Sequence, residues 1–237
     1  MRQNRKGFTL IEMLVVIAII SVLSMGISML NMKDSSQSAY SAQQSMITAF
    51  YEARVAAMQK QSDVRVLIYK GPDATRRLRQ VGVVYRSKGR DDMELGWVAL
   101  NDGFIMPQNV FFVPPENDFD KFVKPGKDVE ASEIYKSTFN NGYTGAYEVV
   151  NISQFPSRQP EALTEGSGDW YSYKFSSDGL SLNPGARVML AMGRIDGNGI
   201  YTVDNPYSQV GFVIRLLGHT IPFSGYDEME ETIKEQQ

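Results

Sequence analysis

Hydrophobic positions follow three different patterns along this chain. Near the N-terminus, the 20 residues from position 13 to position 32 carry no charge and are mostly apolar. Beyond them, small and apolar residues recur every three or four positions, as on one face of an amphipathic helix. From Val64 onward the apolar runs become short, β-branched and aromatic, which is typical of strands. The pattern predicts an α+β protein in which a long N-terminal helix packs on a mostly antiparallel β-sheet domain.

The helix should run from about residue 9 to about residue 61, because the first proline of the chain is Pro72. A face of small residues is typical of close packing against a sheet, so we interpret this face as core and not as a ligand site. Its members are Ala39, Ala42, Met46, Ala49, Phe50, Ala53 and Ala57.

The strand pattern is set off by glycine, proline, aspartate and asparagine. The predicted strands are 64–69, 81–86, 95–100, 110–113, 170–175, 186–192 and 211–217, the first three as a meander. Turns are predicted at 176–179, 196–199 and 218–219. Residues 114–169 are rich in proline and glycine, and we expect an insertion with little regular structure apart from a short helix near 130–136.

The N-terminal residues have the order of a membrane anchor. The apolar run is long enough to span a bilayer as a helix. Three basic residues and no acidic residue precede it, namely Arg2, Arg5 and Lys6, and they should hold this end of the helix in the cytoplasm. A cleaved secretory signal has the same order, but this run is too long for one, no A-x-A site follows, and Glu12 interrupts it. We therefore expect a retained single-pass anchor with the rest of the chain translocated.

The stretch GFTLIE, residues 7–12, together with the basic leader and the apolar run, resembles the type IV prepilin signal of type IV pilins and of the pseudopilins of type II secretion. The resemblance implies that a prepilin peptidase cleaves the Gly7–Phe8 bond and that Phe8 is N-methylated. It also implies that Glu12 pairs with the amino terminus of a neighbouring subunit during assembly. Burying one charge in an apolar layer costs much free energy, and an opposite charge beside it offsets this cost, so such a pairing is physically reasonable. A glutamate that only snorkels to the headgroups is the alternative.

A softer resemblance narrows the family. The stretches EARVAAMQKQSDVRVLIY, GWVALNDGFIMPQNV, YKFSSDGLSLNPGARVMLAM and GFVIRLLGHTIPF are similar to the H-type minor pseudopilin and the T-type minor fimbrial protein. The resemblance implies a pilin-like fold, and the insertion departs from the compact members of this subgroup. With the hydrophobic pattern, we expect a leader at 1–7, a transmembrane half-helix at 8–32, an amphipathic half-helix at 33–62, a β-rich domain at 63–226 with the insertion at about 114–169, and an acidic tail at 227–237.

By this resemblance the chain is a minor pseudopilin, a non-enzymatic subunit of a type II secretion pseudopilus. It would sit in the bacterial inner membrane with its C-terminal domain in the periplasm. Its partners would be other pseudopilins or pilins, the prepilin peptidase, the inner-membrane assembly platform and the lipid bilayer. A minor pilin of a type IV pilus, serving initiation, adhesion or DNA uptake, is the alternative within the same class.

Two groups of residues give weak signals for a ligand, one for calcium and one for DNA. Asp196, Asn198 and Asp204 form a faint oxygen-rich loop that could hold calcium, but an Asn-Gly hairpin needs the same residues and the spacing matches no complete EF-hand, so we predict no metal. A local basic cluster could meet DNA, although a net charge of −3 argues against nucleic acid as a partner. The cluster comprises Arg76, Arg77, Arg79, Arg86, Lys88 and Arg90.

Catalysis has little support in the sequence. The chain has no cysteine and a single histidine, His219, in a predicted turn, and it carries no phosphate-binding glycine loop or zinc motif. We predict no enzyme and no cofactor. From a different functional class, a membrane-tethered β-domain binding module or enzyme is kept as an alternative, with Trp170, Tyr171, Tyr173 and the long insertion as its ligand face.

Overall fold

The computed structural model describes residues 10–89, 93–138, 147–182, 184–225, 228 and 231. Side chains at positions 10, 12, 18, 21–36, 147 and 148 lie outside this description. The predicted leader and, apart from residues 228 and 231, the predicted acidic tail are outside it too. The chain divides into two compact units, Met1–Gln37 and Ser38–Gln237.

Helix α1, Leu10–Lys60, is the first element. Its end lies within one residue of the expected position, and Gln61, with a φ of 46°, follows it. Within the residues that the structure describes, no helix contains a stretch long and apolar enough to cross a membrane. The structure describes only some of the side chains of the predicted span at 13–32.

The second unit is built from mostly antiparallel sheets, which together with α1 confirm the α+β class. The largest sheet has seven strands in the order β3-β2-β1-β9-β7-β8, with β4 also paired to β2. Its strands are β1 Val64–Tyr69, β2 Gln80–Lys88, β3 Glu94–Ala99, β4 Phe104–Ile105, β7 Tyr147–Ile152, β8 Leu163–Glu165 and β9 Trp170–Phe175. Strands β1, β2 and β3 form the predicted meander.

Two smaller sheets complete the unit. The four-stranded sheet has the order β14-β13-β10-β5, and the three-stranded sheet has the order β11-β12-β6, with a parallel pairing between β12 and β6. Their strands are β5 Val110–Phe112, β6 Val123–Pro125, β10 Ala186–Met192, β11 Arg194–Ile195, β12 Tyr201–Val203, β13 Val210–Ile214 and β14 Thr220–Ser224. The short helices are α2 Glu116–Phe122, η1 Ala131–Glu133 and η2 Pro206–Ser208.

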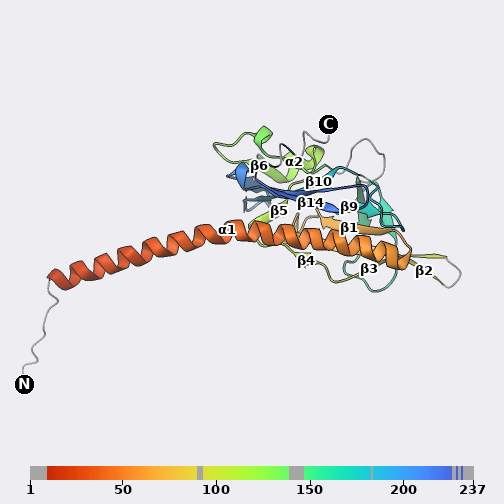
Figure 1. Ribbon diagram of the computed structural model, residues 1–237, viewed down its shortest axis with the longest axis horizontal. Coiled ribbons are helices and arrows are strands. Elements are labelled where there is room, and N and C mark those ends of the chain that lie inside the picture. The colour runs from red at the N-terminus through yellow and green to blue at the C-terminus, as the bar shows by residue number, and fades with distance from the viewer. Residues whose placement is uncertain are drawn as a thin grey trace, which may run out of the picture. The chain divides into compact units, whose positions relative to one another are not determined.

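The C-terminal part of α1 lies along the strands of this unit (Figure 1) and buries its small-residue face against them. Phe50 is fully buried in this face. Its ring centroid lies 5.3 Å from that of Tyr173 in β9 and 5.1 Å from that of Phe212 in β13. One helical side chain therefore contacts both the seven-stranded and the four-stranded sheet, as the alanine-rich pattern predicted for a core face.

A buried amide fixes the helix on the four-stranded sheet. Gln43 is 2% exposed, and its Nε2 donates hydrogen bonds to the backbone carbonyls of Gly211 at 2.5 Å and Phe223 at 2.8 Å. A buried amide is costly unless it is hydrogen-bonded, so these two acceptors restrict how the helix can slide along β13 and β14.

The predicted insertion is an integral part of the large sheet, and the expectation of little regular structure was wrong. Strands β7 and β8 extend that sheet beyond β9. Alternate residues of β1 point away from α1, and Leu67 is buried there in a second core that includes Trp170, Ile152 and Phe155. Strands β7 and β8 and the residues after β7 cover this outer face, which would otherwise leave apolar side chains in water. The expected short helix near 130–136 is present as η1.

Replacing Phe50 tests whether the helix organises the core. Phe50→Ala in the chain from Lys33 onward should lower the free energy of unfolding by about 3–5 kcal/mol, because a fully buried ring is lost from the junction of two sheets. Chemical denaturation measures the change, and Tyr51→Ala serves as the control because Tyr51 is 60% exposed. A loss below about 1 kcal/mol for Phe50→Ala would contradict the observed packing.

Candidate interaction surface

The residues of the predicted processing and assembly site lie at the edge of what the structure describes. Gly7 and Phe8 are outside the described residues. Glu12 lies within α1, but its side chain is outside the description. Cleavage, methylation and the charge pair of Glu12 therefore stay predictions, and the structure informs the function through the second unit.

Helix α1 carries a second apolar stripe, most of which is exposed. Tyr40, Tyr51 and Met58 are 48%, 60% and 40% exposed, and Ile47 is partly buried and packs against the core. These positions are separated by 7, 4 and 7 residues, which places them on one side of a helix. The spacing is that of a helix–helix contact, and we call these four residues the outer stripe.

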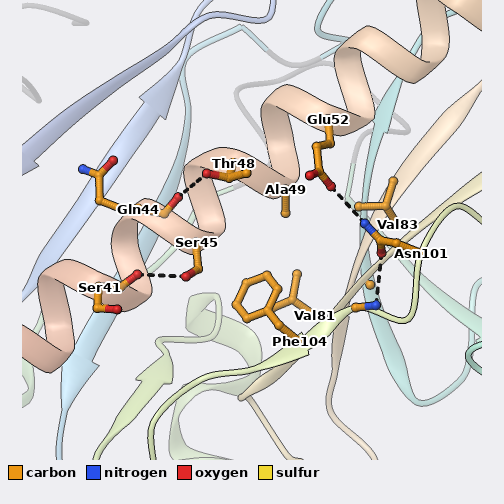
Figure 2. A pocket seen from close by; sticks show the side chains of 12 residues that line it. Ser41, Gln44, Ser45, Thr48, Ala49, Glu52, Val81, Val83, Asn101 and Phe104 are labelled. Carbon is orange, nitrogen blue, oxygen red and sulfur yellow. Dashed lines mark hydrogen bonds between the residues drawn. The ribbon is translucent and has the colours of Figure 1, made fainter.

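A groove of about 440 Å³ lies along another side of the same helix (Figure 2). One wall is the polar helix side that includes Ser45, Thr48 and Glu52, and the opposite wall comes from β2 and β4. Val81 and Phe104 project from these strands toward the helix. The groove therefore combines an apolar floor with a polar rim, which suits an amphipathic segment of a protein partner.

Hydrogen bonds hold the rim of the groove in place. Asn101 donates from Nδ2 to Glu52 Oε2 at 2.9 Å, and the backbone N–H of Gly103 donates to Asn101 Oδ1 at 3.0 Å. Gly103 has a φ of 69°, which favours glycine because it has no Cβ. The hydroxyls of Ser45 and Thr48 donate to helix carbonyls, so their oxygens are available as acceptors. The rim thus offers mainly hydrogen-bond acceptors to a partner.

Two of the three weak calcium candidates, Asp196 and Asp204, are engaged with basic side chains. Asp196 pairs with Lys124 at 2.9 Å, and its Oδ1 accepts from the backbone N–H of Asn198, so it shapes the turn that ends at Gly199. The backbone N–H of Ile200 also donates to Asp196, and this hydrogen bond is the largest cause that lowers the pKa of the Asp196 carboxyl. The hydrogen bonds from Lys124 and Asn198 lower this pKa further. Among the described residues, no group of three or more acidic, histidine or cysteine side chains is arranged to hold a metal.

Asp204 belongs to a separate ion pair. Its two carboxylate oxygens accept from Arg194 at 2.8 and 2.9 Å, a bidentate arrangement across β11 and β12. This pairing raises the pKa of the Arg194 guanidinium. The carboxylates of Asp196 and Asp204 thus take part in the turn and in ion pairs of this hairpin.

The basic cluster is used largely within the fold. Arg77 donates to the carbonyls of Gly71 at 2.8 Å and Gly199 at 3.1 Å, and Arg79 donates to the carbonyl of Met106. Arginines that satisfy backbone carbonyls in this way stabilise loops and do not form a free row of cations for a phosphate backbone. The last member, Arg90, lies outside the described residues.

The aromatic ligand face proposed as an alternative is not a surface. Trp170, Tyr171 and Tyr173 are 3%, 0% and 1% exposed, because both faces of β9 are covered. The prediction was wrong for Tyr171 and Tyr173, since strand aromatics in the centre of a covered sheet are core. Trp170 is also buried, but it lines a cavity together with residues of the insertion. His219 is exposed in the turn between β13 and β14, where it was expected.

Sequence reasoning missed two buried charges that join distant segments. Asp118 in α2 pairs with Lys70 at 3.0 Å and accepts from the Tyr171 hydroxyl at 2.8 Å. Arg65 in β1 is 2% exposed and pairs with Glu165 in β8. The pairs join residues 48 and 100 positions apart, so no local spacing reveals them. An apolar strand that contains one arginine was the available signal for Arg65.

The environment of Asp118 sets up a pH-dependent contribution to stability. Burial alone would raise the pKa of this carboxyl, but hydrogen bonds from Lys121, Tyr171 and Lys70 outweigh burial and lower the pKa to about 2. Its ordinary value is 3.8, so ionised Asp118 stabilises the fold above that pH, and the contribution is lost as the pH falls through about 2.

We therefore expect Asp118→Asn to lower the free energy of unfolding at pH 7 by about 1–3 kcal/mol, because the lysines lose their buried counter-charge. The difference from the wild type should shrink between pH 4 and pH 2, as measured by denaturant unfolding. Asp120→Asn is the matched control, since Asp120 is exposed on the same helix. A difference that is independent of pH would show that the charge of Asp118 is not the cause.

Comparison with known proteins identifies only the N-terminal segment. The family described as "Prokaryotic N-terminal methylation motif" matches residues 2–28, which include Gly7, Phe8 and Glu12. No curated protein and no solved structure gives a significant match. Proteins with this motif are in general structural subunits that a prepilin peptidase processes and that assemble with other pilins. The chain thus carries the N-terminal methylation motif that is typical of type IV pilin-like proteins.

Proposed function

We propose that this chain is a minor pseudopilin, a non-enzymatic structural subunit of a type II secretion pseudopilus, closest in kind to the H-type subgroup. The observation that carries the proposal is the methylation motif at residues 2–28, placed at the start of a helix that continues to Lys60. The α+β domain that packs on the end of this helix supports it. The choice of a secretion pseudopilus over a type IV pilus rests on the softer resemblance in the helix end and the strands.

In this proposal the chain is a single-pass protein of the bacterial inner membrane with its second unit in the periplasm. The charge-free run at 13–32 has the length of a bilayer span, and Arg2, Arg5 and Lys6 precede it. Cleavage between Gly7 and Phe8 would remove these three basic residues. The mature chain would then begin with the charged amino group of Phe8 next to the apolar run.

Glu12 is the proposed assembly contact inside the membrane. A carboxylate there costs several kcal/mol in the absence of a partner, as order-of-magnitude transfer scales indicate. The amino terminus of Phe8 on a neighbouring subunit would supply the opposite charge at a similar depth. Such a pair favours association, because each charge is costly alone and tolerable only with the other.

The outer stripe extends the proposed contact into the second unit. Tyr51 and Met58 are large apolar side chains that the isolated chain exposes on one side of α1. A neighbouring helix with apolar residues at the same spacing would cover the stripe.

A cysteine at the stripe tests this contact directly, because the chain has no cysteine of its own. Tyr51→Cys, labelled with a maleimide photo-crosslinker in membranes that contain the other pilin-like subunits, should form adducts with one of them. Ser167→Cys is the control, since Ser167 is also exposed but lies in the turn between β8 and β9. Equal adduct yields at both positions would contradict a specific contact at the stripe.

Glu12→Gln in the Tyr51→Cys background separates the charge pair from the stripe. The amide keeps the size of the side chain but loses the ionic attraction, so leader cleavage should be normal while adduct formation and secretion fall. If Glu12 only snorkels to the headgroups, adducts and secretion stay at the level of Tyr51→Cys alone, and the charge-pair proposal is then wrong.

A further inference from the structure

A second cavity, of about 540 Å³, lies on the face of the seven-stranded sheet that points away from α1. It opens where the loop after β7 crosses the ends of β1 and β9. Its exposed lining is mainly polar, in contrast to the apolar floor of the groove beside α1. The side chains that matter for its chemistry are Tyr69, Arg76, Asn151, Gln154, Phe155 and Asp169.

Arg76 is held in place but keeps donors available. Its Nε donates to Gln80 Oε1 at 2.6 Å, and its guanidinium lies 5.0 Å from the centroid of the Tyr69 ring. Within the described part of the chain, Arg76 forms no ion pair, and its two terminal amino groups donate no hydrogen bond. A fixed guanidinium with four free N–H bonds therefore borders the cavity.

Asp169 brings the opposite charge to the same cavity. Its side chain is exposed, and its carboxylate has no ion-pair partner among the described residues. Arg76 and Asp169 thus line one cavity without pairing with each other. Asn151 and Gln154 add side-chain amides, which donate through nitrogen and accept through oxygen.

The charged and amide groups of the cavity indicate which ligands can form hydrogen bonds with all of them. The guanidinium only donates, the carboxylate only accepts, and the amides do both. An anion would be attracted by Arg76 and repelled by Asp169, and a cation would meet the reverse. A neutral polyhydroxyl compound satisfies both groups, because each hydroxyl can donate and accept.

The size and the apolar part of the cavity agree with the same class of ligand. Its volume is within the range of about 300–1,000 Å³ that is typical of small-molecule sites. Phe155 is half-buried at the border, where its ring stacks edge-on against Trp170 with centroids 5.4 Å apart. The part of this ring that lines the cavity can receive the C–H face of a sugar. We propose that this cavity binds a short neutral saccharide, independently of the helix-mediated assembly.

Calorimetric titration of the full chain tests the proposal, in a detergent without a sugar headgroup so that the detergent does not compete. The probes are cellobiose, maltose and N,N′-diacetylchitobiose, with triglycine as a non-sugar of comparable polarity. At least one disaccharide should bind. Asp169→Asn and Gln154→Ala should each weaken this binding by about tenfold or more, since each removes a hydrogen-bonding group.

The variants are chosen so that folding does not confuse the result. Asp169 and Gln154 are both exposed, and Asp120→Asn applies the same chemical change as Asp169→Asn outside the cavity, so it should bind as the wild type does. An unchanged unfolding temperature confirms that each variant is folded. The proposal is overturned if no disaccharide binds, if binding survives both cavity variants, or if triglycine binds at the cavity and the sugars do not.

Discussion

The fold depends on the close approach of α1 to two sheets at once. Small side chains let the helix approach the sheets closely, and these are the alanines at positions 39, 42, 49, 53 and 57. The one aromatic ring among them, Phe50, therefore reaches Tyr173 in one sheet and Phe212 in the other. Gln43 adds a buried polar contact that fixes where the helix lies along β13 and β14. Because both sheets are attached to the same helix, the groove and the outer stripe have defined positions relative to the core.

This arrangement gives the sides of one helix different roles. The alanine side is core, the side with Ser45 and Glu52 forms a polar-rimmed groove, and the side with Tyr51 and Met58 stays apolar and exposed. Large apolar residues on a regular helical spacing have no use in an isolated soluble unit, but they suit a subunit that packs beside others. The methylation motif at residues 2–28 also agrees with a subunit that assembles with others.

The sequence was informative wherever an element is long and its pattern regular. Strands β1, β9 and β10 have the predicted bounds, and α1 ends within one residue of the expected position, because periodicity and strand composition are local properties. Strands β6, β11 and β12 were missed, since two or three residues carry no periodic signal. The role of the insertion was missed because covering the outer face of a sheet is a tertiary property. The same holds for Arg65 with Glu165 and for Asp118 with Lys70, which meet only through the fold.

If the chain is processed and assembled as a pilin-like subunit, its mature amino terminus differs from the encoded one. Intact-mass and tandem mass spectrometry of the protein purified from native membranes would determine that terminus. We expect a chain that lacks residues 1–7 and begins with N-methylated Phe8. A chain that retains Met1, or one that is cut on the C-terminal side of the apolar run as a secretory signal would be, would contradict it.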